Sequence, residues 1–127
     1  MYKKNPYDKY TNNNIYTAPK EELTLMLYEG ALKFVNQAVI AIEANDFAKA
    51  NDLLIRVQDI YRELQFTLNH KYEISKELNT LYTYIISRTR EANMKKSLEI
   101  LDEVRDLTRD FRDTWKEAMK LAKTNNQ

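Results

Sequence analysis

The sequence predicts an all-α fold, an antiparallel up-down-up-down four-helix bundle preceded by an irregular or short-helical N-terminal arm. Both prolines, Pro6 and Pro19, precede Lys20, and Gly30 is the single glycine in the sequence. From Lys20 onward Leu, Glu, Lys, Ala and Arg dominate, which is the composition of long helices. Short polar turns divide this stretch into four segments, and turns of this length make successive helices antiparallel neighbours.

Four helices are expected near residues 20–44, 47–69, 73–93 and 97–123. Asp46, after Asn45, and Ser97 stand where polar side chains cap the start of a helix. The sequence Asn69-His70-Lys71 is typical of a turn between the second and third helices.

An apolar stripe in steps of three and four marks the expected core face of the later helices. On the second helix the stripe comprises Phe47, Ala50, Leu54, Val57, Tyr61, Leu64 and Leu68. On the third it comprises Ile74, Leu78, Leu81, Ile85 and Ala92. On the fourth it comprises Ile100, Val104, Leu107, Phe111, Ala118 and Leu121, with Thr114 as a weak layer. Trp115 is expected to pack on the fourth helix, with a fluorescence emission that a bound partner barely changes.

The first helix has more apolar surface than one core face needs. From Leu23 to Ile42 its apolar positions span about 200° of the helix, whereas a core-facing stripe needs only about 100°. The helix therefore either lies centrally among its neighbours or leaves apolar surface for a partner. Glu29 and Lys33 exclude a membrane span, and Gly30 predicts the close approach of another backbone.

Large apolar side chains away from the stripes predict a groove for a partner. Ile55 and Phe66 are about three turns apart on one line of the second helix, and Tyr82 and Ile86 are displaced from the third stripe. An apolar groove along a bundle is where an amphipathic segment binds. The expected groove residues are Ile55, Phe66, Tyr82, Ile86, Leu25, Tyr28 and Leu32. Scattered surface hydrophobics are the alternative interpretation.

The arm at residues 1–18 is expected to be a lid on the bundle domain at residues 19–127. The arm is rich in asparagine and tyrosine and has no helical period. Tyrosine can lie over apolar surface with its hydroxyl in water. The residues expected to make these contacts are Tyr7, Tyr10, Ile15 and Tyr16. A tail without a role is the alternative.

The charge balance argues against nucleic acid and membrane partners. Lys and Arg total 20 against 19 Asp and Glu, so no basic field exists to attract phosphates. The sequence has no cysteine, no signal-sequence pattern and no apolar run long enough to cross a bilayer. These features predict a cytoplasmic protein without membrane insertion.

Catalytic and metal chemistry are not expected. His70 is the one histidine, and Thr67 stands where the Glu-x-x-His pairs of di-iron bundles need a glutamate. The sequence contains no cysteine nucleophile and no glycine-rich phosphate loop. We therefore expect no enzyme activity, no cofactor and no metal.

Three stretches of the sequence are specific motifs, whereas the composition indicates only long helices. They are NPYDKYTNNNIYTAPKEELTLMLYEGAL at 5–32, EANMKKSLEIL at 91–101 and RDTWKEA at 112–118. Over essentially the whole chain they resemble the flagellin-specific export chaperones of bacterial flagellar secretion, the FliS family. The matching positions of the first stretch are Tyr7, Tyr10, Asn13, Ile15, Thr17, Ala18, Pro19 and Leu25 to Leu32. The one departure is that Pro19 directly follows Ala18, whereas the family often has Ser or Thr before its proline.

The resemblance implies a bundle that binds the C-terminal segment of new flagellin, prevents its early polymerisation and assists type III export. The amphipathic terminal helices of a filament subunit expose an apolar stripe as free chains, so such a chaperone needs a matching groove. The resemblance leaves room for further partners, namely the export apparatus, an anti-sigma factor or an assembly factor. The alternative function is a self-associating structural or adaptor bundle, and we expect a monomer or a weak homodimer.

Overall fold

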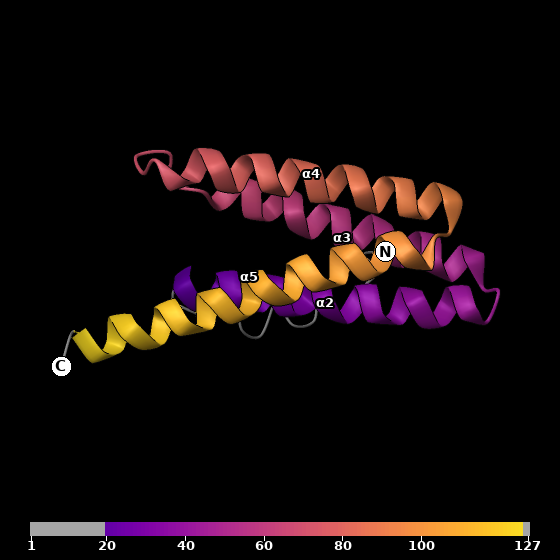
Figure 1. Ribbon diagram of the computed structural model, residues 1–127, viewed down its shortest axis with the longest axis horizontal. Coiled ribbons are helices and arrows are strands. Elements are labelled where there is room, and N and C mark those ends of the chain that lie inside the picture. Colours follow the sequence, from indigo (N-terminus) through magenta and orange to yellow (C-terminus); the bar gives the residue numbers. More distant parts are fainter. Residues whose placement is uncertain (1–19, 126–127) are drawn as a thin grey trace, which may run out of the picture.

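The computed structural model describes residues 20–125, which form four α-helices joined by short turns (Figure 1). The helices are α2 (Lys20–Glu43), α3 (Phe47–Thr67), α4 (Ile74–Lys95) and α5 (Leu98–Asn125). The predicted all-α fold, with four helices in this order, is confirmed. The predicted arm at 1–18 lies outside the described residues.

Side chains cap the starts of α3 and α5 at the two predicted positions. Asp46 Oδ1 accepts a hydrogen bond from the backbone N–H of Lys49 at 3.2 Å. Ser97 Oγ accepts one from the backbone N–H of Ile100 at 3.1 Å. The first N–H groups of a helix have no partner within the helix, so each cap satisfies a donor that would otherwise need water.

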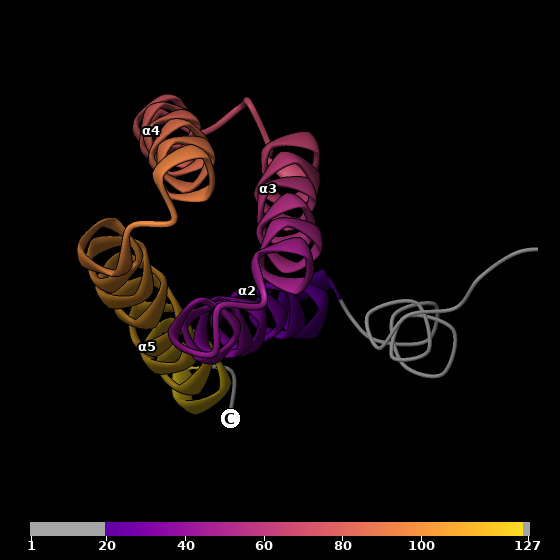
Figure 2. The ribbon, with the colours of Figure 1, turned by 90° about the vertical axis from the view of Figure 1, so that its right-hand side faces the viewer.

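The helices surround one core in ring order, and α2 has two well-packed neighbours (Figure 2). α2 packs against α3 and α5, α3 packs against α4, and α4 packs least extensively against α5. Two flanking helices explain why the apolar arc of α2 is so wide. By length and composition α2 could also cross a membrane, but in this fold its apolar face is largely buried in the bundle.

Gly30 does not mark the close approach of another backbone, so that prediction is wrong. A Cβ added at Gly30 would meet only the Cδ1 of Ile60, at 3.5 Å, which is an ordinary contact between side-chain atoms.

The core face of α3 follows its predicted stripe. The buried members of the stripe are Ala50, Leu54, Val57, Tyr61 and Leu64. Phe47, the first residue of the helix, is an exception and is exposed at the end of the bundle. The step of three and four therefore identified the buried side of this helix correctly.

The core face of α4 is rotated from its predicted stripe. Tyr82 and Ile86 are buried, so their expected placement off the core is wrong. Ile74 and Leu81, which were expected in the core, are 59% and 42% exposed. The reason is that α5 diverges from α4 beyond their shared turn, which uncovers the side of α4 that faces α5 (Figure 1).

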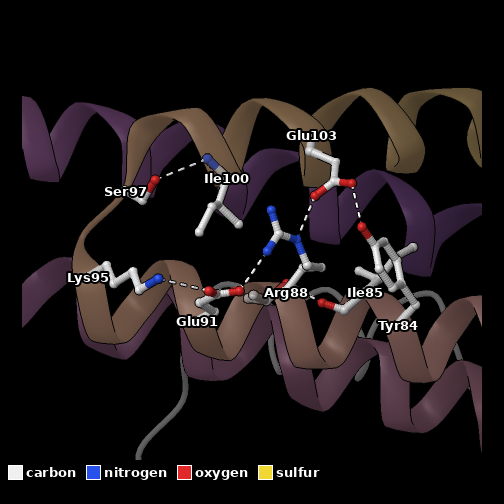
Figure 3. A network of polar contacts seen from close by, with 9 residues as sticks. Tyr84, Ile85, Arg88, Glu91, Lys95, Ser97, Ile100 and Glu103 are labelled. Atoms are coloured by element: carbon white, nitrogen blue, oxygen red, sulfur yellow. Dashed lines mark hydrogen bonds and ion pairs between the residues drawn. The ribbon is translucent and has the colours of Figure 1, made fainter.

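Near the shared turn, hydrogen bonds to Glu103 of α5 join the two helices (Figure 3). Tyr84 Oη donates to Glu103 Oε2 at 2.6 Å, and Arg88 Nε donates to Glu103 Oε1 at 2.7 Å. These bonds, first that from Tyr84, lower the pKa of the Glu103 carboxyl below its usual range. Arg88 also donates to Glu91, which accepts from Lys95 in turn. We call Tyr84, Arg88 and Glu103 the clasp.

Leu54→Asp should unfold the bundle, whereas Ile55→Asp should leave the far-UV circular dichroism and the thermal midpoint nearly unchanged. Leu54 is 0% exposed and Ile55 is 45% exposed. An unpaired charge in an apolar core costs several kcal/mol, about as much as the whole stability of a small domain. Thermal melts of the two variants make the comparison. Unfolding of Ile55→Asp would place that side chain in the core and contradict the assignment.

Candidate functional site

A mostly apolar pocket of about 480 Å³ lies between α4 and α5, at the end of the bundle away from their shared turn. All four helices contribute to it: the start of α2, the end of α3, the start of α4 and the C-terminal half of α5. Both Figure 1 and Figure 2 show α5 turning away from α4 toward this end. We call it the α4–α5 groove. Its apolar lining includes Leu64, Leu68, Ile74, Leu78, Phe111 and Ala118.

The groove is open because the C-terminal half of α5 packs against α2. Phe111 stacks on Tyr28 of α2, with ring centroids 5.6 Å apart and planes within 5° of parallel. One turn further on, the indole Nε1 of Trp115 donates to the backbone carbonyl of Glu21 at 2.8 Å. These contacts hold α5 to α2, so the side of α4 that faces α5 has no helix against it there.

The floor of the groove is formed by Tyr28, Tyr82 and Phe111, and the buried Tyr61 packs against Tyr82 behind it. The ring of Tyr82 lies 5.5 Å from that of Phe111 and 5.6 Å from that of Tyr61. The hydroxyls of Tyr28 and Tyr82 are hydrogen-bonded, and Tyr61 Oη lies 2.6 Å from Thr108 Oγ1. Among the described side chains, no buried nitrogen or oxygen lacks a partner. The floor is therefore apolar toward an occupant.

Burial keeps these hydroxyls protonated. It raises the pKa of Tyr61, and the hydrogen bond with Thr108 opposes it only in part. Burial is also the largest cause that raises the pKa of Tyr28 and of Tyr82. Because a free tyrosine ionises near pH 10, all three are neutral under physiological conditions.

The seven residues predicted to form one groove are not brought together. Tyr28 and Tyr82 line the floor of the α4–α5 groove. Leu32 and Ile86 are buried, Leu25 is partly buried, and none of these three lines the groove. Neighbouring helices cover the α2 and α4 surface at Tyr28, Leu32, Tyr82 and Ile86 that the sequence left open for a partner.

Ile55 and Phe66 lie on the outer face of α3, away from the groove. They are 45% and 85% exposed, and each is about half a turn around the helix from the buried Val57. The ion pair of Asp59 with Arg62, at 3.2 Å, lies between them along the same face. The two side chains do not form a continuous apolar surface, and whether a partner contacts them or the α4–α5 groove is a question for peptide-binding measurements.

Sequence reasoning missed Ile74, Leu78 and Phe111 as groove residues because it placed them in the core. A helix that is left unpaired shows the same step of three and four as a helix that is covered. The polar Thr114 within the apolar stripe of α5 was the one sign in the sequence that this part of the stripe is not covered. In the structure Thr114 lines the groove. Trp115 also lines the groove, so its emission is expected to respond to an occupant. The predicted lid residues Tyr7, Tyr10, Ile15 and Tyr16 lie outside the described residues.

Within residues 20–125, no three His, Cys, Asp or Glu side chains are grouped so that they could hold a metal ion. What these helices present is an apolar groove bordered by polar helix faces. An apolar groove along a helical bundle is the kind of surface on which an amphipathic segment of another polypeptide can bind.

The family model described as flagellar protein FliS matches residues 3–122, and the chain belongs to this family. The flagellar secretion chaperone FliS of Bacillus subtilis (strain 168) is 45% identical over 115 residues, which cover 91% of this chain and 86% of the relative. That of Campylobacter jejuni is 30% identical over 113 residues, covering 87% and 88%. That of Escherichia coli (strain K12) is 28% identical over 108 residues, covering 83% and 79%.

A solved structure described as a flagellar chaperone from bacteria has the same fold. It superimposes with a TM-score of 0.75 at 19% identity, covering 90% of this chain and 94% of the other. The predicted resemblance to the FliS family is thus confirmed, and the relatives named above are flagellar secretion chaperones.

The bundle should lose stability as the pH rises above 10. Unfolded tyrosines then lose protons that the buried ones keep, so the stabilisation is complete below pH 10 and falls as the pH approaches the raised pKa. Each such tyrosine lowers the free energy of unfolding by about 1.4 kcal/mol per pH unit. Tyr61→Phe should remove one such contribution, since Thr108 Oγ1 still donates to the Val104 carbonyl at 2.7 Å.

Urea unfolding at pH 8, 10.5 and 11 measures this slope for the wild type and for Tyr61→Phe. Tyr72→Phe is the matched control because Tyr72 is 64% exposed. An equal change of slope in both variants would contradict the assignment to the buried hydroxyl.

Proposed function

We propose that this chain is a cytoplasmic chaperone that binds the C-terminal segment of flagellin, prevents its early polymerisation and assists its type III export. The observation that carries the proposal is the α4–α5 groove, an apolar seam between two helices that lacks a covering element. Membership of the FliS family, whose relatives are flagellar secretion chaperones, supports a flagellar cargo.

The groove suits an amphipathic helix. Ile74 and Leu78 of α4 border it on one side, and Phe111 and Ala118 of α5 border it on the other. A helix that placed an apolar stripe between them would bury the exposed sides of both. Ordering a free tail on binding costs conformational entropy, which limits affinity and allows later release.

A second copy of the chain is the competing occupant, and the named function of the relatives does not favour it. Sedimentation at micromolar concentration, with and without a flagellin C-terminal peptide, separates the two. A complex that forms only with the peptide supports the chaperone. A homodimer that the peptide leaves intact supports a structural bundle. The export apparatus, an anti-sigma factor and an assembly factor are the further partners that we propose.

Ile74→Asp should weaken the binding of a flagellin C-terminal peptide more than about tenfold, whereas Phe66→Asp should not. Ile74 and Phe66 are 59% and 85% exposed, so neither carboxylate is buried in the empty protein. In the complex only the carboxylate at position 74 would lose its hydration. Burying an unpaired polar group costs about 1–3 kcal/mol, and a charge costs more. Isothermal calorimetry measures the affinities, and Trp115 emission reports whether the groove is filled.

The same experiment tests the site that the sequence predicted. A loss of affinity in Phe66→Asp or Ile55→Asp, with Ile74→Asp unaffected, would move the cargo to the outer face of α3. An unchanged Trp115 spectrum at saturating peptide would also contradict binding in the groove.

We also propose that residues 1–18 are a lid, with Tyr7, Tyr10, Ile15 and Tyr16 as its contacts. Lys20 and Glu21 line the groove, so the arm joins the bundle at the edge of the apolar surface. A segment tethered there has a high effective concentration, which makes a weak contact sufficient.

Deletion of residues 1–17 should leave the bundle folded, raise the binding of a hydrophobic dye, increase self-association and change cargo affinity several fold in either direction. Dye fluorescence, sedimentation and calorimetry measure these quantities, and circular dichroism checks the fold. If all three quantities match those of the full chain, the lid is rejected.

A further inference from the structure

Rows of carboxylates follow α4 and α5 along the line where the two helices face each other. We call this line the α4–α5 seam; it is closed at the clasp and open at the α4–α5 groove. The clasp identifies the faces of α4 and α5 that point toward each other, because Tyr84 of α4 donates to Glu103 of α5 across the seam. Seven residues are about two turns, so a residue seven positions away lies on nearly the same line of a helix. On α4, Glu77 is seven residues before Tyr84, and on α5, Asp110 and Glu117 are seven and fourteen residues after Glu103.

The antiparallel register places Glu77 opposite Asp110. Each is reached by moving seven residues from the clasp toward the open end of the seam. The residues that follow them, Leu78 and Phe111, both line the groove, which agrees with this register. Glu77 and Asp110 are exposed and therefore stand at the two rims, directly beside the apolar lining.

At the closed end of the seam, a cation lies between carboxylates of α4 and α5 and pairs with both. Arg88 lies between a carboxylate of each helix, with Nε 2.7 Å from Glu103 and Nη1 2.6 Å from Glu91 (Figure 3). One guanidinium can bind two carboxylates because its donors form a planar fork. The clasp shows which chemistry joins acidic rows on α4 and α5.

At the open end, residues 20–124 supply no such cation to Glu77 or Asp110. Neither carboxylate has an ion pair among these residues, and Arg109 and Arg112, which are close to Asp110 in sequence, pair with other aspartates of α5. Lys20, the one cation among the described residues that line the groove, is on α2 and not on either rim. Like charges on the two rims also repel, which disfavours closure of α4 onto α5.

We infer that the cargo segment in the groove presents a lysine or arginine side chain between Glu77 and Asp110. The inference rests on the proposed function and narrows its cargo to an amphipathic helix with a cation beside its apolar stripe. The cargo cation takes the place at the open end that Arg88 takes at the closed end. Charge complementarity at the rim then sets the register and orientation of the cargo.

The test compares two charge-neutralised variants of the full chain. Glu77→Gln with Asp110→Asn changes the rims, and Asp52→Asn with Glu63→Gln removes the same charge from exposed positions on α3. The rim variant should bind a flagellin C-terminal peptide about three- to tenfold more weakly at 50 mM salt, because each exposed pair contributes modestly. At 0.5 M salt the difference should fall below about twofold through screening. The α3 variant should match the wild type at both salt concentrations.

Peptide variants identify the cation. We replace each lysine or arginine of the peptide by glutamine in turn. One of these peptides should bind the wild type about as weakly as the unchanged peptide binds the rim variant. That peptide should bind the rim variant and the wild type equally well, because the two changes remove the same interaction. If the wild type binds the peptide but the rim and α3 variants behave alike, the inference is overturned and the proposed function stands. If the wild type binds no peptide, both are overturned.

Two other occupants would appear as distinct results. If the rim variant alters the sedimentation of the empty protein and leaves peptide affinity unchanged, the rims contact a second copy. If it alters dye binding only while residues 1–17 are present, the rims contact the chain's own arm, which carries Lys3, Lys4 and Lys9. Either result overturns the inference.

Discussion

The stacking of Phe111 on Tyr28 determines the form of the open end of the bundle. It commits the second half of α5 to α2, and the bond from Trp115 to the Glu21 carbonyl extends the same attachment by one turn. α4 packs against α3, and its packing against α5 is the least extensive among the four pairs of neighbouring helices in residues 20–125 and includes the clasp. The groove, its aromatic floor and its acidic rims all follow from this unequal packing.

The floor of the groove combines polar atoms with an apolar surface. Tyr28 and Tyr82 on the floor pair their hydroxyls with each other, and the buried Tyr61 behind them pairs its hydroxyl with Thr108, so these oxygen atoms need no water. Buried polar groups that are fully paired add rigidity to a core. An occupant therefore meets ring faces and aliphatic side chains held in fixed positions, while the charges that would select it stand at the rims.

The sequence was sufficient for the fold but only partly for the site. Steps of three and four, with caps at Asp46 and Ser97, identify the helices because they depend on local physics. The same steps show which side of a helix is apolar and not which neighbour covers it. Ile74 therefore resembled a core residue and Tyr82 a surface residue, and the tertiary position of α5 reverses both assignments. The family was recognised from extended motifs, which carry no information about the divergence of α5.

Both ends of the described chain lie at the open end of the bundle. Lys20 lines the groove, and α5 continues past it to Asn125 (Figure 1). A reporter domain or surface linkage attached directly at Lys20 or Asn125 would therefore lie at the open end, beside the groove. The α2–α3 and α4–α5 turns are at the opposite end. Met94, 80% exposed beside the second of these turns, is a suitable place for a dye. Because the sequence contains no cysteine, Met94→Cys gives a single attachment point that leaves the groove unobstructed.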